Sequence, residues 1–166
     1  MQNKHYGKHR LFGSLAGLAF LGLVAFSSCE KEDSDSTPKS AKYSLSGAAS
    51  GSQEVPAVTT SATGSLSGSY DTTSKSLIYT VTWTGLSGEA TMAHFHGPAL
   101  AGAIASPIET LTITTNGTAG TATDTITATS ALHAALLAGQ VYYNVHTAAH
   151  PDGEIRGQIA VVQQSR

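Results

Sequence analysis

Most of the chain alternates hydrophobic and polar residues in short segments, a pattern typical of β-strands with one buried face. In residues 74–86, SKSLIYTVTWTGL, one face should carry Leu77, Tyr79, Val81 and Trp83, and the other Ile78, Thr80 and Thr82. Similar strands are predicted at 43–47, 64–70, 91–96, 108–114, 120–126, 141–146 and 155–162. Gly, Ser, Asp and Asn turn signals separate them. About eight short strands at this spacing predict an antiparallel all-β sandwich or barrel.

One segment departs from this alternation. Residues 128–140, ATSALHAALLAGQ, begin with Thr and Ser, place Leu132 and Leu136 four positions apart, and reach a natural stop at Gly139. The pattern predicts a short helix over one end of the sandwich. His133 on this helix is interpreted as an ordinary surface or half-buried histidine.

The N-terminus has the three parts of a secretory signal. Basic residues at Lys4, Lys8 and Arg10 precede an apolar run of 16 residues, 11–26, and then small residues before Cys29. The run is shorter than the roughly 20 residues of a membrane-spanning helix. Residues 27–29 resemble a lipobox, so residues 1–28 are predicted to be a lipoprotein signal peptide, with Cys29 acylated as a membrane anchor. A free thiol in an ordinary secreted protein is the alternative.

The segment after Cys29 is charged, rich in Ser and Thr, and without large apolar residues, so residues 29–42 are predicted to be a disordered tether. Its acidic start resembles the sorting tag of some bacterial surface lipoproteins. The predicted location is therefore the cell envelope, lipid-anchored at the outer membrane and facing the surface or periplasm. Residues 43–166 remain as one domain, the usual size for one hydrophobic core.

The composition of this domain excludes several functions. From residue 43 onward it carries three cationic and seven acidic side chains, a net charge of −4. Nucleic acid is not an expected partner, because phosphate binding needs clustered Lys and Arg. Phosphate loops, a nucleophile elbow and paired catalytic carboxylates are also absent from the sequence, so no catalytic residues are predicted.

Candidate chemistry lies in MAHFHGPA, residues 92–99. In a strand, His94 and His96 point to the same side and Phe95 enters the core. Two such imidazoles can chelate copper or zinc. They could equally be two polar side chains at a strand end.

A second candidate is the predicted hairpin of residues 141–159. Tyr142, Asn144 and His146 share one face of its first strand, and a symmetric turn would place Asn144 near Arg156 and His146 near Glu154. A three-histidine metal site forms if His146 lies beside His94 and His96. Asn144, Glu154 and Arg156 are then candidates to support the ligands or guide an anion, and His150 in the loop is a candidate extra ligand.

The sequence resembles the CHRD family, which is named for repeats in chordin. The resemblance rests on YSLSGAASGSQEVPAVTTSATG, LIYTVTWTGL, AHFHGPA and LLAGQVYYNVHTAAHPDGEIRGQI, and covers about residues 43–162. A more distant similarity in motif order links it to copper–zinc superoxide dismutase, where a His-x-His strand and a later Val-His supply copper ligands. These resemblances imply a Greek-key β-sandwich, superoxide-dismutase-like or immunoglobulin-like. The resemblance to copper–zinc superoxide dismutase implies that His94, His96 and His146 correspond to copper ligands. It also implies that Arg156 corresponds to an arginine that guides the anion.

Two functions follow as hypotheses. The first is a tethered CHRD lipoprotein that binds a metal ion, with copper favoured over zinc because three nitrogens and an open position suit copper. Binding without catalysis is favoured over redox activity of the superoxide dismutase type, since no zinc loop, bridging histidine or disulfide is present. The second is a non-catalytic extracellular adhesion or protein-interaction module without metal. It would expose an apolar patch near Tyr142 or Phe95 to an extracellular protein partner.

Overall fold

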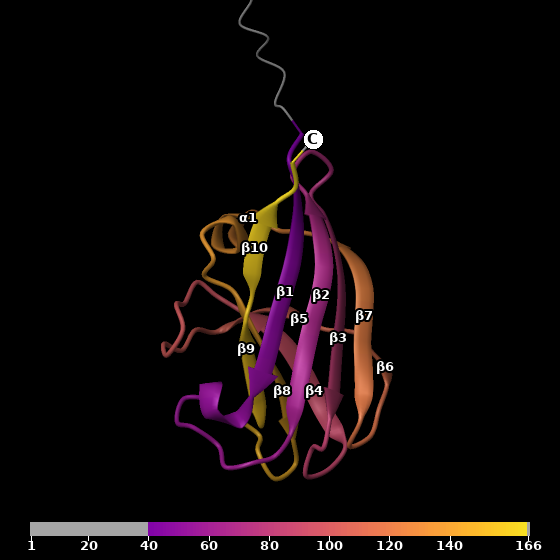
Figure 1. The fold of residues 1–166 in the computed structure, drawn as a ribbon, viewed down its shortest axis with the longest axis vertical. Coiled ribbons are helices and arrows are strands. Elements are labelled where there is room, and N and C mark those ends of the chain that lie inside the picture. The colour runs from indigo at the N-terminus through magenta and orange to yellow at the C-terminus, as the bar shows by residue number, and fades with distance from the viewer. Residues whose placement is uncertain (1–39, 166) are drawn as a thin grey trace, which may run out of the picture. The chain divides into compact units, whose positions relative to one another are not determined.

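The computed structural model describes residues 40–165. The predicted signal peptide, Cys29 and the predicted tether up to residue 39 lie outside the described residues. Within them, the chain forms ten strands, one 3-10 turn and one α-helix (Figure 1). The strands are β1 (Lys42–Ser50), β2 (Thr63–Asp71), β3 (Ser76–Thr84), β4 (Ala90–His96), β5 (Pro107–Thr110), β6 (Ile113–Thr115), β7 (Gly120–Thr127), β8 (Tyr142–Thr147), β9 (Ile155–Gln158) and β10 (Ala160–Gln163).

All strand pairs are antiparallel and belong to one curled sheet. The order is β5-β4-β8-β9-β1-β2-β3-β7-β6, and β10 pairs with β1. In Figure 1, β1, β2, β3 and β7 form the front layer, and β4, β5 and β8 lie behind them. The prediction of an all-β antiparallel fold with one short helix is confirmed.

The core lies between these two layers. The front layer supplies Leu77, Tyr79, Val81 and Trp83, the four residues that the alternation in β3 predicts to be buried together. The back layer supplies Phe95, Tyr143, Val145 and Ile155. The rings of Tyr79 and Phe95 meet edge to face, with centroids 5.1 Å apart. The domain thus holds together by packing from both layers.

The structure has two more strands than predicted, because two predicted strands are each divided. Residues 108–114 split into β5, which pairs with β4, and β6, which pairs with β7. Residues 155–162 split at Ile159 into β9, which pairs with β8, and β10, which pairs with β1. Each division marks the point where the chain changes pairing partner, and the alternation of side chains in a sequence does not report such a change.

The predicted helix is present as α1 (Ser130–Leu137). The Thr129 side chain accepts a hydrogen bond from the Leu132 backbone N–H, a standard N-terminal cap. Leu132 and Leu136 are buried, and Gly139 follows the helix with a φ of 67°. His133 is half-buried and lies 2.6 Å from the Tyr70 hydroxyl, as expected for an ordinary histidine. No helix within residues 40–165 is long and apolar enough to cross a membrane.

Candidate metal centre

Strands β4 and β8 bring three histidines together on the outer face of the back layer. Their register pairs His94 with Asn144 and Met92 with His146, while Phe95 points into the core. Alternation therefore places His94, His96 and His146 on one side. Their side chains are nonetheless largely buried, with exposed fractions of 9%, 7% and 5%.

The three imidazoles are close enough to bind one ion. Each histidine offers one ring nitrogen, and these nitrogens all lie within 4.8 Å of one another. His94 Nδ1 lies 3.0 Å from His146 Nε2. Nitrogens bound at about 2.0–2.1 Å to a single ion lie at most about 4.2 Å apart. The limit of 4.8 Å therefore lies close to the spread that one shared ion allows.

Backbone carbonyls orient two of the three rings. His96 Nδ1 lies 2.9 Å from Ala105 O, and His146 Nδ1 donates to Pro151 O over the same distance. A carbonyl can only accept, so the proton of a neutral His146 ring lies on Nδ1 and its lone pair on Nε2. Histidine ligands of metals usually have their second nitrogen held in this way. His96 has an oxygen acceptor at both nitrogens, because its Nε2 lies 2.9 Å from Asn144 Oδ1, so the neutral ring can donate to only one of the two oxygens.

The surroundings favour the neutral form of all three histidines. Burial is the largest cause that lowers the pKa of His94, His96 and His146 below the ordinary value of 6.5. The neighbouring histidines lower the pKa of His94 and His146 further, and Arg156 lowers that of His96. Neutral imidazole is the form that binds metal, so the cluster is ready to act as a ligand set at neutral pH.

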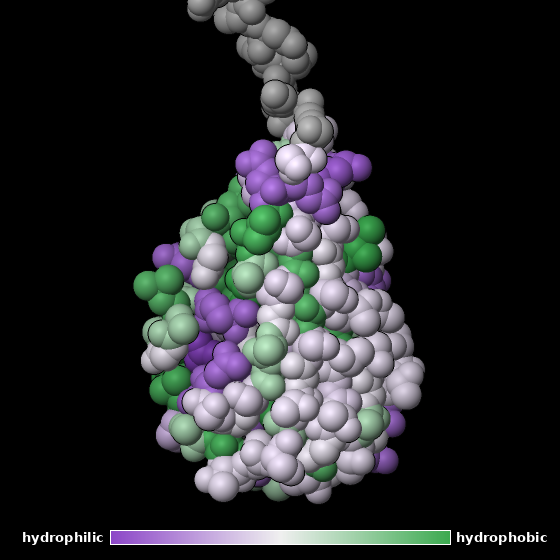
Figure 2. All heavy atoms as spheres, in the orientation of Figure 1, coloured by the Kyte–Doolittle hydropathy of each residue, from purple (hydrophilic) through white to green (hydrophobic). Residues whose placement is uncertain are grey.

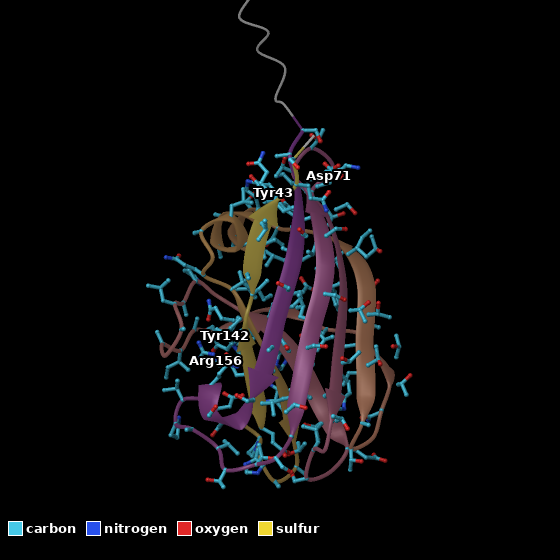
Figure 3. The ribbon with its side chains drawn as sticks, viewed as in Figure 1. Tyr43, Asp71, Tyr142 and Arg156 are labelled. Atoms are coloured by element: carbon cyan, nitrogen blue, oxygen red, sulfur yellow. The ribbon has the colours of Figure 1, made fainter. Side chains whose placement is uncertain are left out.

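Tyr142 separates the histidines from Arg156. The His96 and Tyr142 rings stack with centroids 4.7 Å apart and planes 6° apart, and the Arg156 guanidinium carbon lies 3.5 Å from the centre of the Tyr142 ring. Figure 3 shows Tyr142 and Arg156 side by side next to β9. Because β8 lies between β4 and β9, His96 and Arg156 occupy opposite sides of Tyr142.

The other predicted site residues have different positions. Asn144 pairs with Arg156 across β8 and β9, as predicted. The expected contact of Glu154 with His146 is wrong, because the Glu154 carboxylate accepts from Ser87, Thr147 and Thr60 instead. Thr147 follows His146 on β8 and points to the opposite face, so Glu154 lies away from the histidines. His150 lies outside the three-histidine group.

Some contributors to the site were not predicted. Ala105 and Pro151 act through backbone oxygens in loops, for which the sequence has no signal. Glu54 follows the 3-10 turn η1 (Gly51–Gln53) and is buried near Asn144 and Arg156. Burial raises its pKa to about 7, although Arg156 and the Asn144 side chain lower it. Only Tyr142 could have been found, because it shares its face of the strand with Asn144 and His146.

The fold and site together define an all-β antiparallel domain with a buried three-histidine cluster. The model of the CHRD domain family matches residues 45–159, and the chain therefore belongs to this family. Membership is consistent with an extracellular or cell-envelope protein. No curated protein and no solved structure matches the chain.

Proposed function

We propose that this CHRD domain binds a transition-metal ion through His94, His96 and His146, with copper favoured over zinc. The observation that carries the proposal is the orientation of the rings. His146 donates Nδ1–H to the Pro151 carbonyl, which leaves its Nε2 as an electron-pair donor 3.0 Å from His94 Nδ1, and a contact of Nδ1 with Ala105 O holds the His96 ring. Three imidazole nitrogens suit copper, which such ligands bind more tightly than the other divalent first-row metals.

The function is binding rather than catalysis. An open metal site alone does not supply redox chemistry. Arg156, the residue that matches an anion-guiding arginine, is 2% exposed, and its Nη2 donates to Ala103 O at 2.8 Å. Tyr142 also lies between it and His96. This arrangement favours storage, transfer or sensing of the metal over turnover of a small anion.

Copper titration of the full-length protein without a polyhistidine tag tests the proposal. We expect one equivalent of Cu(II) to bind, with nitrogen hyperfine structure in the electron paramagnetic resonance spectrum. His94→Ala, His96→Ala and His146→Ala should each weaken binding by more than about 100-fold, because each removes a ligand. A parallel zinc titration should give weaker binding.

His150→Ala is the matched control. It removes an imidazole from the neighbouring loop, but His150 is not in the three-histidine group. We expect it to bind copper as the unchanged protein does. If all four variants bind equally, or if copper binds without nitrogen coupling, the three-histidine proposal is wrong.

The second candidate function is a protein-interaction module. The expected apolar patch around Tyr142 or Phe95 is wrong, because these side chains are 2% and 1% exposed. Large exposed hydrophobic side chains occur instead at Leu100 and Ile104, in the loop between β4 and β5. Val162 on β10 is as exposed as Leu100, so the described residues give no single contiguous apolar patch that favours this second function.

We propose also that acylation of Cys29 anchors the protein in the cell envelope. Supporting this are the basic start, the apolar run and the small residues before this single cysteine. In cells, Cys29→Ala should move most of the protein from the membrane fraction to the soluble fraction. Mass spectrometry of the N-terminal peptide should find acyl chains only in the unchanged protein. Identical fractionation of the two would contradict the anchor.

A further inference from the structure

Met92 lies on β4 next to the three-histidine cluster. The register of β4 and β8 pairs it with His146, and it precedes His94 by two positions on the same strand. Side chains at positions i and i+2 share a face, and directly opposite residues have Cβ atoms about 4.5–5.5 Å apart. Met92 therefore neighbours both members of the closest pair of imidazoles, His94 and His146, whose facing nitrogens are 3.0 Å apart.

An irregularity in β4 puts Met92 on this face. Ala90 is buried in the core and pairs with Thr147, but the register shifts between Ala90 and Met92. In a regular strand Met92 would share the inner face with Ala90, two positions earlier. The extra residue instead turns Met92, and His94 and His96 after it, to the outer face. Bulges commonly re-aim side chains in this way beside functional sites.

Met92 is far more accessible than the histidines. Its side chain is 47% exposed, whereas those of the three histidines are at most 9% exposed. The methionine side chain is unbranched and turns about three bonds, which allows its sulfur to approach the imidazoles. The thioether is therefore available to an ion from solvent, while the imidazole nitrogens are largely covered.

The donors around this position are uncharged. No carboxylate or thiol among the described residues belongs to the three-histidine group, and a thioether is neutral as well. Of the neighbouring charged groups, Arg156 lowers the pKa of His96 and Asp152 raises that of His146, so their effects on a cation oppose each other. An ion in this set keeps its own charge, and burying an uncompensated charge is costly. A monovalent ion is therefore held at a lower cost than a divalent one.

The sulfur adds a preference of its own. Thioethers are soft ligands that select Cu(I), whereas imidazole binds several metals. Low ligand charge and a soft donor thus favour the same oxidation state of copper.

We propose that Met92 is the fourth ligand of this centre, through its thioether sulfur, and that Cu(I) is the form of copper bound most tightly. The inference rests on the proposed function, because it requires that the three histidines bind copper. It adds the oxidation state of the ion and the residue that selects it.

Competition titrations against bicinchoninate, under nitrogen with ascorbate, measure the Cu(I) affinity. Every form tested is the full-length chain with Cys29→Ala, because a thiol would bind Cu(I) as well. Met92→Leu keeps the size of the side chain and removes the sulfur. It should lower the Cu(I) affinity at least about ten-fold and the Cu(II) affinity less than about three-fold.

Two further measurements identify the ligand. X-ray absorption of the Cu(I) form should show copper–sulfur scattering that is lost in Met92→Leu, since Met1 is the one other sulfur left in this chain. A ten-fold loss of Cu(I) binding at unchanged Cu(II) binding lowers the reduction potential by about 59 mV, which voltammetry would detect.

Ile78→Leu is the matched control. Ile78 is 48% exposed and introduces leucine at a similar strand position, but β3 pairs with β2 and β7 in the front layer. Residues of intermediate hydropathy cover most of this layer (Figure 2). We expect Ile78→Leu to bind both forms of copper as the unchanged protein does.

The outcomes separate this inference from the proposed function. If Cu(II) binding requires the three histidines but Met92→Leu keeps its Cu(I) affinity and its scattering, the inference alone is wrong. Equal losses of Cu(I) and Cu(II) binding, or the same loss in Ile78→Leu, would also overturn the selectivity assigned to Met92. If the histidine variants change the binding of neither ion, the proposed function is wrong and this inference with it.

Discussion

Replacement of Glu154 with alanine should lower the free energy of unfolding by about 3 kcal/mol. Glu154 is fully buried, and its carboxylate accepts from Thr60 Oγ1, Ser87 N, Ser87 Oγ and Thr147 Oγ1 over distances of 2.6–2.9 Å. Burial alone would raise its pKa, but these hydrogen bonds lower it below the usual value. The carboxylate thus ties two loops to the end of β8, and its removal leaves several donors without an acceptor.

Chemical denaturation of Glu154→Ala against Glu89→Ala measures this effect. Glu89 is exposed in the β3–β4 connection, which also contains Ser87. Its substitution makes the same change of charge as Glu154→Ala but removes no buried acceptor. Glu89→Ala should change stability by no more than about 0.5 kcal/mol.

Copper affinity of Glu154→Ala distinguishes a structural role for Glu154 from the role predicted from the sequence, which is support of the His146 ligand. Since its carboxylate is directed away from His146, the folded variant should bind copper as the unchanged protein does. A variant of normal stability but weakened copper binding would instead place Glu154 in the metal site.

The second large effect concerns Glu54 and pH. Its pKa in the folded protein is raised from 4.5 to about 7, first by burial and then by Asp152, against the opposing effects of Arg156 and Asn144. The unfolded chain therefore releases this proton near pH 4.5, while the folded protein keeps it up to about pH 7. The contribution of Glu54 protonation to the free energy of unfolding is thus fully present below pH 4.5, and it is lost as the pH rises to about 7.

Glu54→Gln should remove this pH dependence, because glutamine resembles the protonated carboxyl group. A shift from 4.5 to about 7 corresponds to about 3 kcal/mol. The stability difference between the variant and the unchanged protein should therefore move by about that amount in favour of glutamine between about pH 4 and pH 8.

Urea unfolding at several pH values measures the difference. The histidines titrate in both proteins, so their contribution cancels. Glu89→Gln, at an exposed position, should show no comparable trend. A difference between Glu54→Gln and the unchanged protein that stays constant over this pH range would show that the folded and unfolded states bind the Glu54 proton equally.

The sequence by itself determined the strands, their buried faces and the helix. Alternation with a period of two decides which face of a strand is apolar, and this local property predicted the burial of Tyr79 and Phe95. It also placed His94 and His96 together, and the turn between β8 and β9 placed Asn144 opposite Arg156. Each of these features depends on residues that are near one another in the chain.

Only the tertiary structure decided what surrounds the histidines. The pairing of β4 with β8 joins residues about 50 positions apart and brings His146 to His94. Backbone oxygens of Ala105 and Pro151 then orient the rings, and Glu54, from the connection between β1 and β2, comes to lie near Asn144 and Arg156. A backbone oxygen is present at every residue, so the side chains of a sequence do not show which oxygen will accept a hydrogen bond from a histidine. Long-range packing of the two layers selects these partners. The same packing places the Glu154 carboxylate against Thr60, Ser87 and Thr147, away from the histidines to which the sequence assigned it.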